Sequence, residues 1–143
     1  MRLPRVLRAF IESLNSQRVE YVIVGGFALA FHGLPRYTGD IDILVRASPE
    51  NAARLNAVIS QFGFASTGLS AKDFLEPDQV IQLGRPPNRI DLLTSITGAA
   101  FEEVWDHRVP SELGGRRRLS PIFSPAREAQ PHGRLSPWRF RGL

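Results

Sequence analysis

Two aspartates one residue apart interrupt an otherwise apolar run, GDIDILV, at residues 39–45. Side chains at positions i and i+2 of a strand point to the same face, so Asp40 and Asp42 project together while Ile41 and Ile43 point to the core. Carboxylates this close repel each other unless a cation or a proton lies between them. Oxygen ligands favour Mg²⁺ or Mn²⁺ at such a pair. A polar face on a half-exposed strand is the alternative interpretation.

The segment before this strand has the composition of a strand followed by a tight turn. Val19 to Val24 is β-branched and aromatic, which predicts a strand, and Gly25 and Gly26 end it. Phe27 to Phe31 then predicts a short helix. Glycines at such a junction let the backbone approach a ligand closely, and a helix N-terminus favours phosphate. An ordinary strand-to-helix turn explains the same residues.

A third aspartate, Asp91, lies in a later apolar run, NRIDLLT. Two short strands, Val80–Leu83 and Arg89–Leu93, flank a turn rich in glycine and proline and predict a hairpin. If the second strand of this hairpin pairs beside the first aspartate strand, Asp91 lies next to Asp40 and Asp42. An isolated aspartate at a strand end is the alternative.

The remaining periodic segments predict helices. Apolar residues recur at three- and four-residue steps from Leu3 to Leu14, which indicates an amphipathic helix. Ser48 followed by a proline predicts a capped helix start, and the apolar pattern carries that helix to about Gly63. Phe101–Trp105 predicts a short helix or turn. Strands and helices together predict one small domain of the α/β (α+β) class.

Composition excludes several classes of protein. The 143-residue chain has no cysteine, which excludes disulfides and cysteine metal sites. It has no apolar run near the ~20 residues that cross a bilayer, so we expect no membrane association and a cytoplasmic location. The net charge of +4 is uneven: residues 114–143 hold seven arginines and one acid, whereas residues 1–113 are mildly acidic. The charge is therefore weak evidence for nucleic-acid binding by the body of the chain.

The order of these motifs is a specific combination. A strand is followed by Gly-Gly, a short helix, D-x-D on a second strand and a third aspartate on a later strand. The chain resembles the nucleotidyltransferase superfamily typified by DNA polymerase beta, and the resemblance lies in the segments VGGFALAFHG, RYTGDIDILV and RIDLLT. The chain looks most like small prokaryotic members, including the minimal nucleotidyltransferases and relatives of the AbiEii abortive-infection toxin. The resemblance covers about residues 1–110 and implies the nucleotidyltransferase fold, a small mixed sheet with helices packed mainly on one face.

The resemblance also implies an activity, which is transfer of a nucleotidyl group from an NTP to a hydroxyl of tRNA or protein. Asp40, Asp42 and Asp91 would be the catalytic residues and would hold two Mg²⁺ (or Mn²⁺) ions. Gly25 and Gly26 would cradle the triphosphate. Arg36 and Thr38, just before the D-x-D, are further candidates for nucleotide binding, and Arg36 is equally explained as a solvated loop residue. A toxin of this kind would have a cognate antitoxin.

The end of the chain departs from this pattern. Residues 114–143 are rich in Arg, Pro and Ser without a sustained period, so we divide the chain into a nucleotidyltransferase-like domain, 1–113, and a basic tail. We predict the tail to be disordered or encoded out of frame. Two other functions therefore stay open: a catalytically impaired module that binds nucleotide or a partner, and nucleic-acid binding through the tail.

Overall fold

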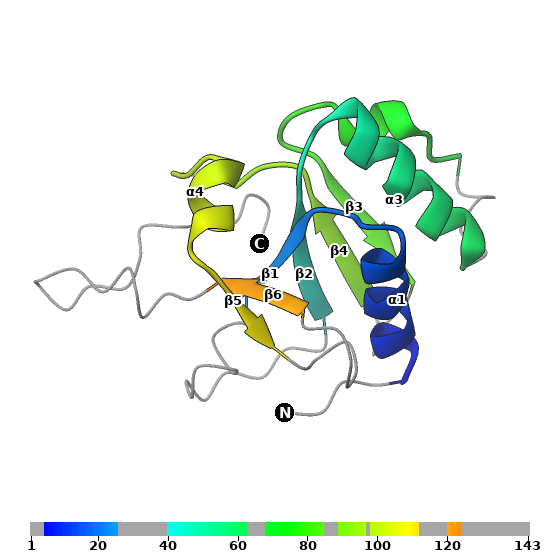
Figure 1. Ribbon diagram of the computed structural model, residues 1–143. Helices are drawn as coiled ribbons and strands as arrows, with labels where there is room; N and C mark the ends of the chain where they lie inside the picture. Colours follow the sequence, from blue (N-terminus) through cyan, green and yellow to red (C-terminus); the bar gives the residue numbers. More distant parts are fainter. Residues whose placement is uncertain are drawn as a thin grey trace, which may run out of the picture.

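A six-stranded mixed sheet with strand order β3-β4-β2-β1-β6-β5 organises the molecule (Figure 1). The computed structural model describes residues 5–25, 40–62, 68–84, 89–96, 98–111 and 120–123, and for Asp40, 110–111 and 120–123 it describes the backbone alone. The strands are β1 (Tyr21–Val24), β2 (Asp40–Val45), β3 (Val80–Leu83), β4 (Arg89–Leu93), β5 (Arg108–Ser111) and β6 (Ser120–Phe123). The helices are α1 (Arg5–Ser16), α3 (Pro49–Gln61), the 3₁₀ turn η2 (Ala71–Phe74) and α4 (Phe101–Asp106). Within the described ranges, no helix is both long and apolar enough to cross a membrane.

Strand β2, which carries the two neighbouring aspartates, lies inside the sheet. It pairs antiparallel with β1 and parallel with β4, and β4 in turn pairs antiparallel with β3. The predicted hairpin of β3 and β4 is therefore confirmed, and so is the placement of its second strand beside β2. Since the parallel β2–β4 pair joins segments far apart in the sequence, this pairing brings the acidic segments together.

One face of the sheet is covered by α1 and α3 (Figure 1). Alternate residues of the inner strands point to this face, and the main core consists of these side chains and the apolar stripes of the two helices. The principal members are Leu7, Phe10, Ile11, Leu14, Tyr21, Ile23, Ile41, Ile43, Leu55, Ile59, Ile90 and Leu92. The period of two along the strands thus leaves the intervening residues, including the aspartates, for the opposite face.

A smaller apolar cluster lies on that opposite face, beneath α4. It contains Val22, Val24, Leu44, Leu93, Ile96 and Val104. Trp105 of α4 packs against this cluster, and the guanidinium of Arg108 lies 3.6 Å from the centre of its ring. The second cluster covers part of the face and borders the row of residues in which the aspartates lie.

Helix α3 begins as the sequence predicts. Ser48 is its N-cap in extended conformation, the Ser48 hydroxyl accepts a hydrogen bond from the backbone N–H of Asn51, and proline follows the cap. The cap satisfies one of the backbone donors that a helix start leaves without a partner, a contribution of about 1 kcal/mol. The cap therefore defines the start of α3 shortly after the end of β2.

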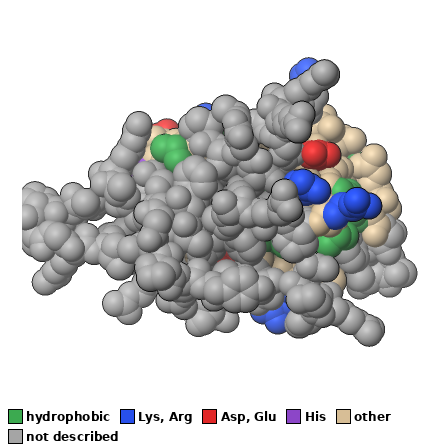
Figure 2. All heavy atoms as spheres, turned by 90° about the horizontal axis from the view of Figure 1, so that it is seen from below, with side chains coloured by type: hydrophobic (Ala, Val, Ile, Leu, Met, Phe, Trp, Pro, Cys, Tyr) green, Lys and Arg blue, Asp and Glu red, His purple; other side chains and the backbone are tan. Residues whose placement is uncertain are grey.

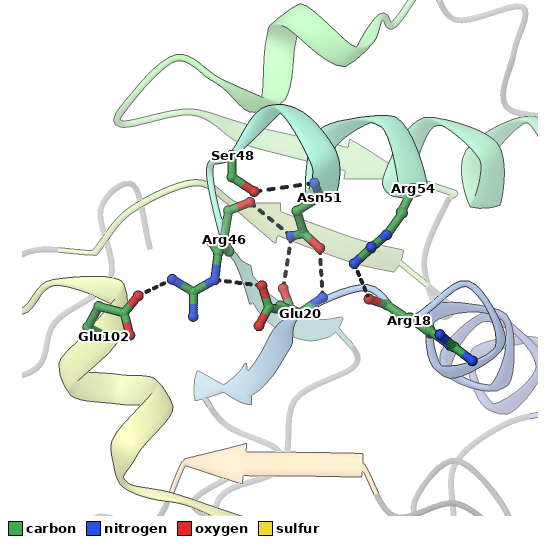
Figure 3. Close-up of polar contacts among 7 residues, drawn as sticks. All are labelled: Arg18, Glu20, Arg46, Ser48, Asn51, Arg54 and Glu102. Atoms are coloured by element: carbon green, nitrogen blue, oxygen red, sulfur yellow. Dashed lines mark hydrogen bonds and ion pairs between the residues drawn. The ribbon is translucent and has the colours of Figure 1, made fainter.

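A polar network ties this end of β2 to its neighbours (Figure 3). The side chain of Asn51 is buried; it accepts a hydrogen bond from the Glu20 N–H at 2.7 Å and donates to the carbonyl oxygens of Glu20 and Arg46. The Arg46 guanidinium donates to the carboxylates of Glu20 and Glu102. The hydrogen bond to Glu102 raises the pKa of Arg46 and lowers that of Glu102 from its ordinary value of 4.5. Strands β1 and β2 and helix α4 are thereby joined through one side-chain group.

Two strands of the sheet do not follow from the sequence patterns. Strand β6 pairs parallel with β1 and antiparallel with β5, so the sheet includes a segment inside the range expected as a tail. Both β5 and β6 contain a proline, Pro110 and Pro121, and proline lowers the strand propensity that a sequence pattern can show. The domain boundary at residue 113 stays a prediction, because residues 112–119 and 124–143 lie outside the described ranges. The predicted helix at Phe27–Phe31 lies outside them as well.

Candidate active site

Asp42 and Asp91 lie side by side on adjacent parallel strands. Their Cα positions are partners in the register of β2 and β4, and Asp40 is the partner of Arg89 one step along the same face. The side chains of Asp42 and Asp91 are buried, with exposed fractions of 6% and 0%. Since neighbouring strands are about 4.8 Å apart, two carboxylates occupy neighbouring positions in the protein interior.

The row that contains this pair continues across four strands. Val24 of β1 is the partner of Asp42, and Gln82 of β3 is the partner of Asp91. The next row toward α4 is apolar, with Leu44 and Leu93 in the small cluster. The carboxylates therefore border an apolar layer on one side, where a negative charge is costly without a positive group nearby.

Gly25, directly after β1, lies against the Asp42 carboxylate. Its φ of +76° is in the left-handed region, and an added Cβ would collide with Asp42 Oδ2 and lie 3.1 Å from its Cβ and Cγ. Glycine is required here for two reasons: a residue with a Cβ would be strained at this φ, and its Cβ would displace the Asp42 carboxylate. The expected close approach of a glycine backbone to the site is thus present on the Asp42 side.

Arg89 lies against the other carboxylate. Its Nε is 3.2 Å from Asp91 Oδ1 and its Nη2 is 3.4 Å from Oδ2. The Arg89 side chain is 28% exposed, whereas Asp91 is fully buried. The positively charged guanidinium of Arg89, at the start of β4, therefore lies beside the Asp91 carboxylate.

The donor set fits a divalent cation. Two buried carboxylates on neighbouring strands supply the oxygen ligands that Mg²⁺ and Mn²⁺ prefer, and the absent side chain at Gly25 makes room for the Asp42 carboxylate itself. Among the side chains that the structure describes, no group of three potential metal ligands occurs. Asp40, the third candidate, is placed by its backbone register alone, next to Arg89 on the face shared by Asp42 and Asp91.

Several residues expected at the site cannot be placed with it. Gly26, Arg36 and Thr38 lie outside the described residues, so their roles in nucleotide binding stay predictions. Of the seven expected site residues, the structure brings Asp40, Asp42, Asp91 and Gly25 to one end of the β1–β2–β4 segment of the sheet.

The sequence analysis did not single out Arg89 or Gln82. Arg89 precedes Asp91 by two residues, so strand alternation alone places both side chains on one face. That signal was available in RIDLLT as soon as the segment was assigned to a strand. Gln82 had no such signal, because its position opposite Asp91 depends on the register of the hairpin.

Comparison with known proteins identifies the family. The profile described as nucleotidyl transferase AbiEii toxin, type IV TA system, matches residues 5–125. The chain belongs to the AbiEii family. It is therefore a nucleotidyltransferase of a toxin–antitoxin family, as the resemblance implied, and the family match extends past β6.

The fold of this AbiEii-family chain also occurs in a solved structure. A crystal structure from Thermotoga maritima, described as that of a candidate nucleotidyltransferase, superposes with a TM-score of 0.61 at 19% identity. The match covers 92% of this chain and 85% of that one. At this identity the likeness establishes the fold, and it confirms the predicted nucleotidyltransferase fold. A search of curated proteins gave no match.

Proposed function

We propose that this AbiEii-family chain transfers an NMP group from an NTP to a hydroxyl of tRNA or of a protein, with Asp40, Asp42 and Asp91 holding two Mg²⁺ or Mn²⁺ ions. The observation that carries the proposal is the buried pair of Asp42 and Asp91 in register on β2 and β4, with the Gly25 backbone against it. Buried like charges on adjacent strands are costly to the fold, which favours a functional reason for keeping both.

The proposal gives each candidate residue a role. Asp42 and Asp40, two residues apart on β2, would bind the ions that accompany the triphosphate, and Asp91 would bind the ion next to the acceptor. Gly25 and Gly26 would approach the triphosphate through their backbone N–H groups, with Arg36 and Thr38 as further contacts. The bound cations would neutralise charge on the attacking and leaving oxygens.

The proposed reaction balances as an in-line displacement. The acceptor hydroxyl oxygen forms a bond to the α-phosphorus, and the bond from that phosphorus to the bridging oxygen breaks. Pyrophosphate leaves with the electron pair, and the hydroxyl proton passes to the Asp91 carboxylate. The apolar layer next to Asp42 and Asp91 lowers the local dielectric constant, which strengthens the attraction of the two carboxylates for a cation between them.

The proposal is tested by label transfer. The purified full-length chain is incubated with α-labelled NTPs, MgCl₂ and cell extract, and RNA and protein are separated. We expect label in one of the two fractions, and loss of at least ~10²-fold with Asp42→Asn, because the metal-binding charge is gone. Gln82→Ala, in the same row but uncharged, is the matched control and should keep most of the activity. Absence of transfer together with no effect of Asp42→Asn would contradict the proposal.

A second candidate is a module that binds nucleotide or a partner without turnover. The Arg89–Asp91 ion pair favours it, because a guanidinium already neutralises a carboxylate that catalysis requires. Calorimetry with NTP and Mg²⁺ separates the two functions: binding without measurable turnover supports the impaired module, and turnover excludes it.

A cognate antitoxin is the partner that the family implies for this chain. We expect expression of the chain alone to slow growth of a bacterial host, and co-expression of the product of the adjacent gene to relieve it. Equal growth with the chain and with its Asp42→Asn variant would argue against toxicity through nucleotidyl transfer. Figure 2 shows Lys or Arg side chains next to hydrophobic side chains on the right of the face that it draws. Nucleic-acid binding through the tail stays a prediction. A cytoplasmic location stays a prediction.

A further inference from the structure

Arg89 is placed within the acidic cluster by the geometry of the sheet. It shares a face of β4 with Asp91 and is the register partner of Asp40 on β2. Its guanidinium reaches both oxygens of Asp91, at 3.2 Å and 3.4 Å. Three acidic positions and one basic position thus form a two-by-two block on adjacent strands.

The charges in this block require a cation whether or not a metal is bound. Asp42 and Asp91 are buried next to each other, and a buried carboxylate without a positive partner is strongly destabilising. In the protein without metal, Arg89 supplies that positive charge at Asp91. When a divalent ion binds the same carboxylate oxygens, the guanidinium and the ion compete for them.

We propose that Arg89 is a resident cation that holds the Asp91 side of the site in the absence of metal and is displaced when a divalent ion binds. The inference rests on the proposed function, since it requires that Asp91 bind the ion. The Arg89 side chain is 28% exposed, so the displaced guanidinium has access to solvent without rearrangement of the core. Arg89 is thereby a positioning residue that sets the affinity of the site for metal.

Two consequences distinguish this role from ordinary structural support. Loss of the charge at Arg89 lowers the stability of the metal-free protein, because Asp91 loses this ion pair. The same change raises the affinity for a divalent ion, because the competing cation is gone, by an amount on the order of tenfold for a directly coupled group. If Arg89 only supported Asp91 structurally, its replacement would lower both the stability of the metal-free protein and the affinity for the divalent ion.

The experiment measures Mn²⁺ binding to the metal-free full-length chain by electron paramagnetic resonance, at one pH, for the original sequence and Arg89→Gln. We expect Arg89→Gln to bind Mn²⁺ about tenfold more tightly. It should also melt at a lower temperature without metal, with the difference shrinking in saturating MgCl₂. Arg46→Gln is the matched control, because Arg46 is another partly exposed arginine in ion pairs, here with Glu20 and Glu102 and away from the aspartates. It should lower the melting temperature with and without metal and leave the Mn²⁺ affinity unchanged.

If the original chain binds Mn²⁺ and Arg89→Gln binds it equally or more weakly, the proposed role of Arg89 is overturned. That result would leave the proposed function intact. If neither protein bound Mn²⁺, the metal-dependent function would fail and the inference with it. Should Arg89→Gln not fold, Arg89→Lys carries the test. Lysine keeps the charge but lacks the planar fork that reaches both carboxylate oxygens, so Mn²⁺ should bind more tightly to Arg89→Lys than to the original chain, and equal or weaker binding would overturn the proposal.

Discussion

Replacement of Gly25 by alanine should damage the site through two separable effects. The first is the backbone: at φ +76°, an L-residue costs about 1–2 kcal/mol relative to glycine. The second is the collision of the new Cβ with the Asp42 carboxylate, which must leave its rotamer at a cost of roughly 0.5–1.5 kcal/mol. We therefore expect Gly25→Ala to lower the free energy of unfolding by about 1.5–3.5 kcal/mol.

Gly68 provides a matched control for the backbone effect. Its φ of +79° is nearly the same, and an added Cβ there would meet nothing within 4 Å. Gly68→Ala should therefore cost about 1–2 kcal/mol, and the excess loss in Gly25→Ala measures the collision with Asp42. Since Gly68 is far from the aspartates in the sequence and belongs to neither of their strands, its replacement should leave nucleotidyl transfer unchanged.

Urea unfolding of the two variants gives the free energies, and transfer of labelled nucleotide gives the activities. We expect Gly25→Ala to be less stable than Gly68→Ala and to lose most of its transfer activity, because the Asp42 carboxylate no longer lies beside Asp91. Equal losses of stability in the two variants, combined with full activity of Gly25→Ala, would refute the reasoning that Gly25 sets the position of Asp42.

Three further predictions concern the site, the network and the tail. Asp42→Asn should stabilise the metal-free protein by about 1 kcal/mol or more, since it removes repulsion between adjacent carboxylates, and it should abolish transfer. Thermal unfolding without metal measures the stability, and a loss of stability would contradict this prediction. Asn51→Ala should cost about 2–4 kcal/mol in urea unfolding, because it removes three hydrogen bonds to the partly buried backbone of Glu20 and Arg46, whereas Asn56→Ala on the same helix should cost less than ~1 kcal/mol. Limited trypsin digestion should cleave within residues 124–143 and leave a folded core that still binds Mg²⁺; a tail that resists trypsin would argue against its predicted disorder.

Local patterns in the sequence were sufficient for the elements that carry the aspartates. Alternation in DIDILV predicted the bounds of β2, and the serine–proline pair predicted the start of α3, because both signals depend on a few adjacent residues. The hairpin of β3 and β4 followed from turn chemistry between two apolar runs. Its position beside β2 was conditional in the sequence, since a parallel pairing between distant segments is decided by the packing of the whole sheet.

The features that the sequence did not reveal depend on tertiary context. Strands β5 and β6 are four residues long and contain Pro110 and Pro121, so local propensity gave no signal for them, and they are recognised only by their pairing in the sheet. The contact of Gly25 with Asp42 likewise needs the register of β1 against β2. Arg89 differs from these, because strand alternation in RIDLLT already places it on the same face as Asp91.

The central claim is that the site built around Asp42 and Asp91 transfers a nucleotidyl group. The most direct test incubates the chain with Mg²⁺ and one NTP labelled either at the α- or at the γ-phosphorus, with its acceptor fraction isolated from extract. The account predicts that the α-label becomes attached to the acceptor while the γ-label appears in pyrophosphate in equal amount, and that Asp91→Asn abolishes both. Attachment of the γ-label to the acceptor, or transfer of the α-label that persists in Asp91→Asn, would contradict it.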